Sequence, residues 1–284
     1  MQKFAVIDIG SNSVRLMFVA DGKVLYKDLC STRLGEGIAD TRLLKDDAIT
    51  RTAQAVVTFY KKANTDGATQ VFAFATAAVR SAKNGQAFVD KVKTLCGLKV
   101  EVVSGEEEAE LGILGALGNQ DGALIDIGGA STELIIKENN TLVYKKSVDI
   151  GVVRIKDAGD NAVKLMENAL IEFGEVPLKS TVYAIGGTAT TIASQVLQLT
   201  AYDSNLISGT KITTAQIIEL VEKWQTMPVQ EIARLPCMPK GRADIILGGA
   251  VWLVTLMNHL KIDEIIVSDS DNLEGYAKKR GLLK

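Results

Sequence analysis

The sequence is poor in residues that several common functions require. It has one histidine and three cysteines, and Cys30, Cys96 and Cys237 lie far apart without a CxxC pair. A zinc site needs clustered sulfur or imidazole ligands, and a Ser-His-Asp triad needs a positioned histidine, so we expect neither. Scattered cysteines are typical of a reducing compartment, and we expect a cytoplasmic protein.

Strong net charge and long apolar runs are also missing. The 32 lysines and arginines against 34 aspartates and glutamates give a net charge of −2, which favours neither nucleic acid nor membrane as a partner. The uncharged segment 180–202 contains Gly186, Gly187 and many hydroxyl residues, so a strand, a turn and a helix are expected there instead of a membrane span. The first expected strand begins at Lys3, so we expect no signal peptide.

An internal repeat relates the two halves of the chain. The segment "AVIDIGSNSVRLMFVADGKVLYKDL" (5–29) aligns without gaps on "ALIDIGGASTELIIKENNTLVYKKS" (123–147), and Asp8 falls on Asp126. The repeat is too long for a solenoid and indicates two copies of a domain. A chain of 284 residues with 47% hydrophobic content has room for two cores.

The hydrophobic pattern predicts strands that alternate with helices, which is typical of the α/β class. Strands are expected at 3–9, 14–20, 23–30, 71–76, 99–103, 122–127, 132–137, 141–148, 181–185 and 263–267. Helices are expected at 45–63, 84–95, 160–173, 214–226, 229–235, 241–259 and 271–281, and two more begin near 104 and 188.

Three glycine turns follow apolar strands, in "DIGSNS" (8–13), "DIGGAS" (126–131) and "AIGGT" (184–188). Glycine allows the backbone to approach a ligand, and successive N–H groups in such a turn can bind an anion. One turn alone would indicate an ordinary hairpin, but two at matching repeat positions favour phosphate binding. For the third turn, tight packing between strand and helix is an equal alternative.

These motifs together resemble one family. The paired "DIG" turns and the "GGT" turn are similar to those of the actin, Hsp70 and sugar-kinase superfamily. The narrower resemblance is to the Ppx/GppA family of exopolyphosphatases and guanosine pentaphosphate phosphohydrolases. The motifs that carry it are "IDIGSNSVRL", "ATAAVRSAKNG", "VEVVSGEEEAELG", "IDIGGASTEL", "AIGGTATTIA" and "GRADIILGGAVWL".

The resemblance implies a pair of actin-like, ribonuclease H-like domains with mixed sheets, helices on their faces and a cleft between them. The expected first domain spans 1–118, with a C-terminal helix (269–284) returning to it. The expected second domain spans 119–268. Longer family members carry further C-terminal helical domains, which we expect this chain to lack.

The resemblance assigns the catalytic carboxylate to Glu108, in "SGEEEAELG". A phosphoanhydride hydrolase needs a base that orients and deprotonates water. Physical reasoning alone does not choose among the glutamates of this motif. A capping box, with Ser104 as N-cap and Glu107 at N3, accounts for Glu107 and, through the helix dipole, for Glu106.

The same resemblance places a metal at Asp126 and Glu133, with Asp8 facing them from the other domain. Hard carboxylate oxygens suit Mg²⁺, with Mn²⁺ as a substitute. A solvent-facing strand position is the alternative for Glu133, and its repeat equivalent is Arg15. The "DIGGAS" turn has Ala130 where the family usually has a third glycine.

Phosphate contacts are expected from the three turns and from one arginine. Arg80, at the end of "ATAAVR", can hold phosphate with two parallel hydrogen bonds, although a surface ion pair is the alternative. Arg15 and Arg242 are weaker candidates for the rim of the site. The full expected set is Gly10, Ser11, Asn12, Ser13, Arg80, Gly128, Gly129, Ala130, Ser131, Gly186, Gly187 and Thr188.

The expected function is Mg²⁺-dependent hydrolysis of a terminal phosphoanhydride on inorganic polyphosphate or guanosine pentaphosphate. Without an extended basic track, we expect a preference for short or nucleotide-borne phosphate chains and distributive release; a homodimer is left open. One alternative is an actin-like kinase that transfers phosphate from ATP to a small molecule. Another is a non-catalytic sensor of polyphosphate or a nucleotide alarmone, which would bind without turnover.

Overall fold

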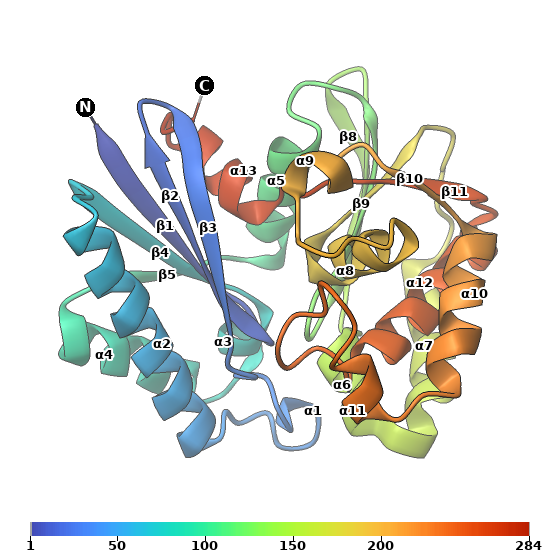
Figure 1. The fold of residues 1–284 in the computed structure, drawn as a ribbon, viewed down its shortest axis with the longest axis horizontal. Helices are drawn as coiled ribbons and strands as arrows, with labels where there is room; N and C mark the ends of the chain where they lie inside the picture. Colours follow the sequence, from blue (N-terminus) through green and yellow to red (C-terminus); the bar gives the residue numbers. More distant parts are fainter. Residues whose placement is uncertain (1, 284) are drawn as a thin grey trace. The chain divides into compact units, whose positions relative to one another are not determined.

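The computed structural model describes residues 2–283, which form two compact units (Figure 1). Unit 1 runs to Gly115 and resumes at Asn272, and unit 2 is the continuous segment Ala116–Asp271. Each unit is a mixed sheet packed with helices, so the expected α/β class is confirmed.

Unit 1 has a five-stranded sheet in the order β3-β2-β1-β4-β5. The first three strands are antiparallel, whereas β4 and β5 run parallel to β1. The strands are β1 (Lys3–Ile9), β2 (Ser13–Ala20), β3 (Lys23–Ser31), β4 (Gln70–Ala75) and β5 (Val100–Val102). The helices are α1 (Ile38–Thr41), α2 (Asp46–Thr65), α3 (Ala77–Ser81), α4 (Gly85–Cys96), α5 (Gly105–Ala116) and α13 (Asn272–Lys279).

Both faces of this sheet are buried by helices. On one face α2 and α4 pack on a core that includes Ile7, Leu16 and Phe18. On the other face α5 and α13 contribute Leu111, Leu273 and Tyr276 to a core with Val6, Met17 and Phe74. Side chains alternate along a strand, so Asp8 lies on the same face as Val6, beneath α5 and α13.

Unit 2 has a six-stranded sheet in the order β10-β11-β9-β6-β7-β8, which repeats the unit 1 topology and adds β10. Its strands are β6 (Gly122–Ile127), β7 (Thr132–Glu138), β8 (Thr141–Val148), β9 (Val182–Ile185), β10 (Lys211–Thr213) and β11 (Glu264–Val267). Its helices are α6 (Val152–Ala158), α7 (Ala162–Phe173), α8 (Gly186–Val196), α9 (Ser204–Ile207), α10 (Thr214–Gln225), α11 (Val229–Ile232) and α12 (Ile246–Leu260), with a short 3-10 turn at Gly159–Asn161.

The internal repeat extends to fine backbone features. The hairpin after β2 turns through Asp21 (φ 51°) and Gly22 (φ 77°), and its equivalent after β7 turns through Asn139 (φ 51°) and Asn140 (φ 60°). Both hairpins have positive φ at their two central residues, as the twist of a two-residue turn requires. A register irregularity follows Phe18 in one hairpin and, in the other, its repeat equivalent Ile136.

The starts of two helices change how their motifs are placed. α8 starts at Gly186 and not near 188, so the third glycine turn is itself the first turn of the helix. α12 starts at Ile246 and not at 241, so the "RAD" segment is a loop that leads into it. No helix in the part of the chain that the structure describes is long and apolar enough to cross a membrane.

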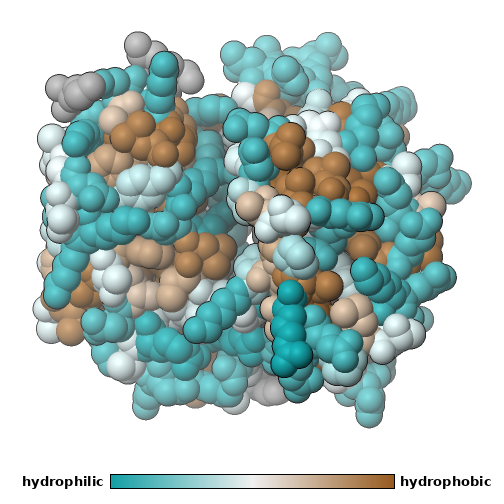
Figure 2. Space-filling view, viewed as in Figure 1, coloured by the Kyte–Doolittle hydropathy of each residue, from teal (hydrophilic) through white to brown (hydrophobic). Residues whose placement is uncertain are grey.

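The edge strands carry apolar side chains at the surface. Figure 2 shows such side chains over β3, where Leu25 and Leu29 are 59% and 44% exposed. The equivalent edge strand β8 exposes Leu142 and Val143. Lysines interrupt both edges, a common device against pairing of sheet edges between molecules.

Candidate active site

The first glycine turn is held in shape by the segment that follows β3. The Gly10 N–H donates to the Ser13 carbonyl at 3.0 Å and closes the turn between β1 and β2. The carbonyl of Asn12 accepts from two backbone N–H groups, at 2.8 and 2.9 Å, and the carbonyl of Ser11 accepts from Gly35. Because these carbonyls are already engaged, the turn is fixed before any ligand arrives.

Glu108 is the buried member of the acidic motif on α5. Its exposed fraction is 7%, whereas Glu106 and Glu107 are exposed. The capping box expected from the sequence is present: Ser104 N–H donates to Glu107 at 2.9 Å and Glu107 N–H donates to Ser104 Oγ at 3.0 Å. Glu107 therefore caps the N-terminus of α5, and Glu108 is turned into the protein.

Burial and its neighbours set the electrostatics of Glu108. Burial raises the pKa of this carboxyl, and Arg80 opposes the shift through its charge and a hydrogen bond from Nη1 to Oε2 of 2.7 Å. The negative charge of Asp8 raises the pKa further. Arg80 Nη1 also donates to the Val103 carbonyl, so its guanidinium is anchored beside the carboxylate. In the structure Arg80 holds Glu108, and its expected contact with phosphate stays a prediction.

Asp8 forms an ion pair with Arg15, its direct cross-strand partner. The Arg15 Nε donates to Asp8 Oδ2 at 3.1 Å, and Nη2 donates to the same oxygen. The aspartate is 3% exposed. In the first copy of the repeat, the charge of the strand-end carboxylate is thus balanced by an arginine of the same copy. The role of Asp8 as a metal ligand stays a prediction.

The second glycine turn closes with the same hydrogen bond as the first, from Gly128 N–H to the Ser131 carbonyl at 2.9 Å. Behind it, the first N–H groups of α6 donate to the carbonyls of Gly128 and Gly129, at 3.0 and 2.8 Å. The close approach of α6 to the second glycine turn requires a glycine at position 151, because a Cβ there would lie 2.5 Å from Ala130 N. Ala130 itself has no positive φ, so alanine fits where the family resemblance led us to expect glycine.

Asp126 and Glu133 are direct cross-strand partners on β6 and β7, and their side chains share one face of the sheet. Glu133 is 2% exposed and accepts a hydrogen bond from the Ser147 hydroxyl. Two carboxylates at this spacing repel each other unless a cation or a proton lies between them. Among residues 2–283, no group of three or more acidic, histidine or cysteine side chains is placed to hold a metal. A pair suits Mg²⁺, which takes one or two carboxylates and fills its other positions with water and phosphate oxygens.

The third glycine turn lies against two charged side chains. Gly186 has a φ of 80°, and a Cβ there would be 2.6 Å from Asp126 Oδ1. A Cβ on Gly187 would be 2.2 Å from Arg242 Nη1, so the guanidinium occupies the space that this glycine leaves. Arg242 is 6% exposed. The turn therefore has a carboxylate on one side and a buried guanidinium on the other, at the N-terminus of α8.

α12 and the loop before it hold these two turns of unit 2 in place. Gly249 lets α12 approach both α6 and α8, because a Cβ there would be 2.7 Å from Val152 and 2.9 Å from Thr188. The Trp252 indole N–H donates to Thr132 Oγ1 at 3.0 Å, just after the second turn. In the "RAD" segment, Asp244 pairs with a lysine of α6.

Two residues that contribute to these clusters were not expected from the sequence. The Thr76 hydroxyl is a hydrogen-bond partner of Glu108, and this threonine is the N-cap residue of α3. Gly151 allows α6 to pack against the second turn. A signal for Thr76 was available, since it stands between an apolar strand and the "AAVR" segment.

The expected residues therefore form two clusters, each described within its own unit. Unit 1 brings together the first turn, Glu108, Arg80, Asp8 and Arg15. Unit 2 brings together the second and third turns, Asp126, Glu133 and Arg242. Each cluster combines a glycine turn with at least one buried carboxylate and a buried or half-buried arginine, groups that suit a phosphoryl compound and a hard cation.

The sequence matches the Ppx/GppA phosphatase family over residues 18–278. The chain belongs to this family. The family resemblance drawn from the sequence motifs is thereby confirmed, and the chain is a member of a family of phosphatases.

Several members are similar along the whole chain. Exopolyphosphatase 2 of Mycobacterium tuberculosis is 30% identical, over 98% of this chain and 98% of the relative. The crystal structure of the Aquifex aeolicus Ppx/GppA enzyme has a TM-score of 0.77 and 29% identity, over 98% of this chain and 99% of that one. The guanosine-5'-triphosphate,3'-diphosphate pyrophosphatase of Pseudoalteromonas translucida is 28% identical over 99% of this chain, which spans 58% of that relative.

Proposed function

We propose that this Ppx/GppA protein hydrolyses the terminal phosphoanhydride of a phosphate chain, and that Glu108 is the general base. The observation that carries this proposal is the pair formed by buried Glu108 and half-buried Arg80, close to Asp8 at the end of β1. A base that deprotonates water near neutral pH needs a pKa above that of an exposed carboxylate, and burial provides that shift here.

In this mechanism the protein positions groups that already carry the required charge. Glu108 accepts a proton from the attacking water, and Arg80 and Thr76 fix the orientation of the carboxylate. The backbone N–H groups of the glycine turns and Arg242 hold phosphate oxygens. Phosphoryl transfer is catalysed largely by such positioning and charge neutralisation.

Asp126 and Glu133 would hold Mg²⁺, or Mn²⁺ in its place. The fit rests on the two carboxylates meeting on one sheet face with Glu133 buried. The metal would neutralise charge on the transferred phosphoryl group. Asp8 remains a proposed third contributor.

The proposed substrates are short inorganic polyphosphates and guanosine pentaphosphate. Relatives named for each of these activities support the proposal that the bond hydrolysed is a phosphoanhydride. The proposed phosphate ligands are three short turns and two buried or half-buried arginines, which suffice for a few phosphates only. A long chain would need an extended basic surface, because its binding sums many phosphate contacts.

The deciding experiment measures free phosphate released from polyphosphates of several lengths, from guanosine pentaphosphate and from ATP with candidate acceptors. Wild type should release phosphate from one or both of the first two, and Glu108→Gln should not. Glu107→Gln is the matched control, because glutamine also completes a capping box. Phosphate transfer from ATP to an acceptor without hydrolysis would instead indicate a kinase, and binding without turnover a sensor.

Gel analysis of long polyphosphate separates the two modes of release. A steadily shortening ladder is expected from distributive hydrolysis. Full-length chains that persist beside free phosphate would show processive hydrolysis and contradict the proposed preference for short chains.

A further inference from the structure

Arg154 on α6 is a largely buried arginine with an incompletely satisfied guanidinium. Its side chain is 14% exposed, and its Nε is buried without a hydrogen-bond partner in the part of the chain that the structure describes. Its Nη2 lies 3.5 Å from Asp149 Oδ2, which is longer than a normal N–H···O hydrogen bond. Asp149 is itself 73% exposed, so water screens this ion pair. Such a charge is costly to bury, because its lost contacts with water are not replaced.

The guanidinium of Arg154 lies at the N-terminal end of α6. Side chains of an α-helix point back toward its N-terminus. Arg154 follows this rule, because its partner Asp149 precedes Val152, the first residue of the helix. At the same end, the first N–H groups of α6 donate to the carbonyls of Gly128 and Gly129 in the second glycine turn. These backbone groups are already engaged, so the side chain of Arg154 is the donor that this end of α6 offers to a ligand.

None of the arginines assigned above serves the second glycine turn. Those of unit 1 belong to the cluster of the first turn, and Arg242 lies against the third. The strands on either side of the second turn carry Asp126 and Glu133. A phosphate group next to two carboxylates requires positive charge nearby. Arg154 would supply a charge that an arginine keeps at every physiological pH.

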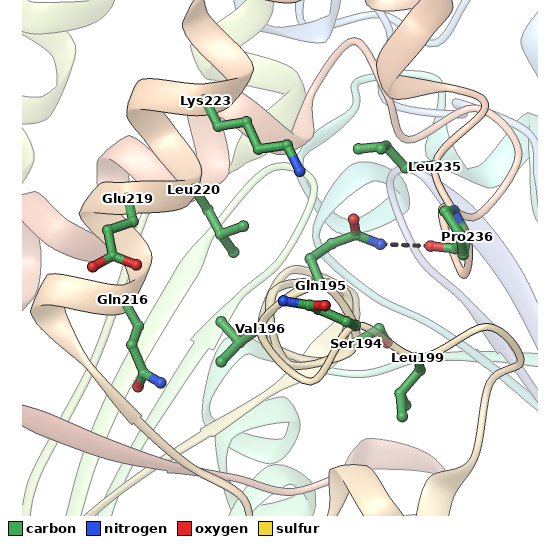
Figure 3. Close-up of a pocket in the computed structure, with 11 residues that line it drawn as sticks. Ser194, Gln195, Val196, Leu199, Gln216, Glu219, Leu220, Lys223, Leu235 and Pro236 are labelled. Atoms are coloured by element: carbon green, nitrogen blue, oxygen red, sulfur yellow. Dashed lines mark hydrogen bonds between the residues drawn. The ribbon is translucent and has the colours of Figure 1, made fainter.

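The cavity of unit 2 at the C-terminal end of α8 offers no comparable group. It has a volume of about 440 Å³, and Glu219 and Lys223 line it from α10 (Figure 3). Both of these side chains are exposed, so water already satisfies their charges. Arg154, in contrast, is buried next to a glycine turn.

We propose that Arg154 binds a phosphate group of the substrate at the second glycine turn. This assignment rests on the phosphate-chain substrate proposed above. The guanidinium donates two parallel hydrogen bonds to phosphate oxygens, and the buried Nε is one of the two donors. Asp149 pairs with the arginine until a phosphate replaces it, since an ion pair with an exposed carboxylate is weak.

The test is calorimetric titration of the full chain with inorganic tripolyphosphate, in a Glu108→Gln background that is expected not to hydrolyse it. Arg154→Met should weaken binding by about tenfold or more, because charge-assisted hydrogen bonds are lost. Arg154→Lys should have intermediate affinity, since lysine keeps the charge but not the paired donors. Without ligand, the melting temperature of Arg154→Met should stay equal or rise, because methionine replaces a poorly satisfied buried charge.

Asp149 should compete with the phosphate for Arg154. Asp149→Asn is expected to tighten tripolyphosphate binding by about two- to fivefold, the range of an exposed ion pair. In an Arg154→Met background the same substitution should change binding little, and this double-mutant cycle separates the pair from a general effect of charge. Asp160→Asn removes another exposed carboxylate of unit 2 and should bind like the parent protein.

Lys223→Met is the matched control for loss of a cation, because it removes an exposed lysine from the cavity of Figure 3. The proposal is overturned if tripolyphosphate does not bind at millimolar concentration, or if Arg154→Met binds it as well as the parent or Lys223→Met does. It is also overturned if weaker binding in Arg154→Met comes with a clearly lower melting temperature, as a structural role predicts. Binding through Arg154 without turnover in the wild type would contradict the proposed function and retain this phosphate site.

Discussion

Asp126 on β6 is the direct cross-strand partner of Glu133 on β7. The equivalent positions of the first repeat hold Asp8 and Arg15, which neutralise each other. One backbone arrangement therefore carries an ion pair in unit 1 and a pair of like charges in unit 2. The two repeat copies have therefore diverged at this position, into an aspartate–arginine pair in unit 1 and two carboxylates in unit 2.

Replacement of Glu108 should separate catalysis from stability. Glu108→Gln is expected to lower kcat by about a hundredfold or more, since general-base catalysis typically contributes that much. A raised pKa means that the folded protein holds this proton more tightly than the unfolded chain, so native stability falls as pH rises through that pKa. Glutamine carries no such charge, and the melting temperature at neutral pH should stay equal or rise.

Glu107 provides the contrast. Glu107→Ala loses the capping box and should lower the melting temperature while activity at permissive temperature persists. Near-normal turnover in Glu108→Ala together with lost turnover in a well-folded Glu107→Ala would show that the base is misassigned by one residue.

The pH profile should report the environment of Glu108. A general base must be ionised, so kcat/KM should fall at acidic pH. The pKa that describes this acid limb should lie above the pKa of an exposed glutamate. Arg80 lowers this pKa, and Arg80→Met should therefore move the acid limb to higher pH. Activity measured from pH 5 to 9 tests this shift. A limb that moves to lower pH, or stays in place, contradicts the assigned pair.

Activity should depend on a divalent cation. It should be lost in EDTA and restored by Mg²⁺ or Mn²⁺, and Asp126→Ala should raise the Mg²⁺ concentration needed for half-maximal rate. Metal binding measured directly, by Mn²⁺ titration with electron paramagnetic resonance, should weaken in the same variant. Full turnover in chelator would rule out the carboxylate pair as a catalytic metal site.

Gly187 should be required for the position of Arg242. Its backbone has no positive φ, so alanine is conformationally acceptable, but the new Cβ would displace the guanidinium. We expect Gly187→Ala to raise KM several-fold with little change in melting temperature, because only the end of a flexible side chain moves. In an Arg242→Met background the same substitution should add almost nothing. Additive effects in this double-mutant cycle would show that the glycine acts through another contact.

α13 should stabilise unit 1 through a buried charge. Glu274 is 5% exposed and pairs with Lys27 of β3 at 2.6 Å. Lys27→Met leaves this carboxylate in the interior and should lower the free energy of unfolding by about 2–4 kcal/mol. Lys211→Met, which removes an exposed pair with Glu264, should cost less than about 1 kcal/mol. Equal losses in urea denaturation would contradict the role of the buried pair.

The repeated strands were predictable because two independent signals agreed there. The apolar alternation and the gap-free alignment both predict β1–β3 and β6–β8, and each of these strands lies within about one residue of its expected bounds. The short helices α3 and α6 were not predicted, since five to seven residues are too few to establish a helical period. The contact between Gly187 and Arg242 joins residues far apart in sequence, and no local spacing encodes it.

The packing of α13 on α5 has a consequence for biosynthesis. A Cβ on Gly275 would lie 1.8 Å from the Leu111 carbonyl, so the two helix backbones are in contact, and Leu273 and Tyr276 complete the core beneath α5. α13 follows unit 2 in the chain and leaves the ribosome only after the whole of that unit. The sequence of unit 2 is complete before α13 is synthesised. Until α13 is available, the helix that carries Glu108 keeps an uncovered apolar face. A released chain truncated before α13 should therefore hold a protease-resistant unit 2 beside an exposed, chaperone-accessible unit 1.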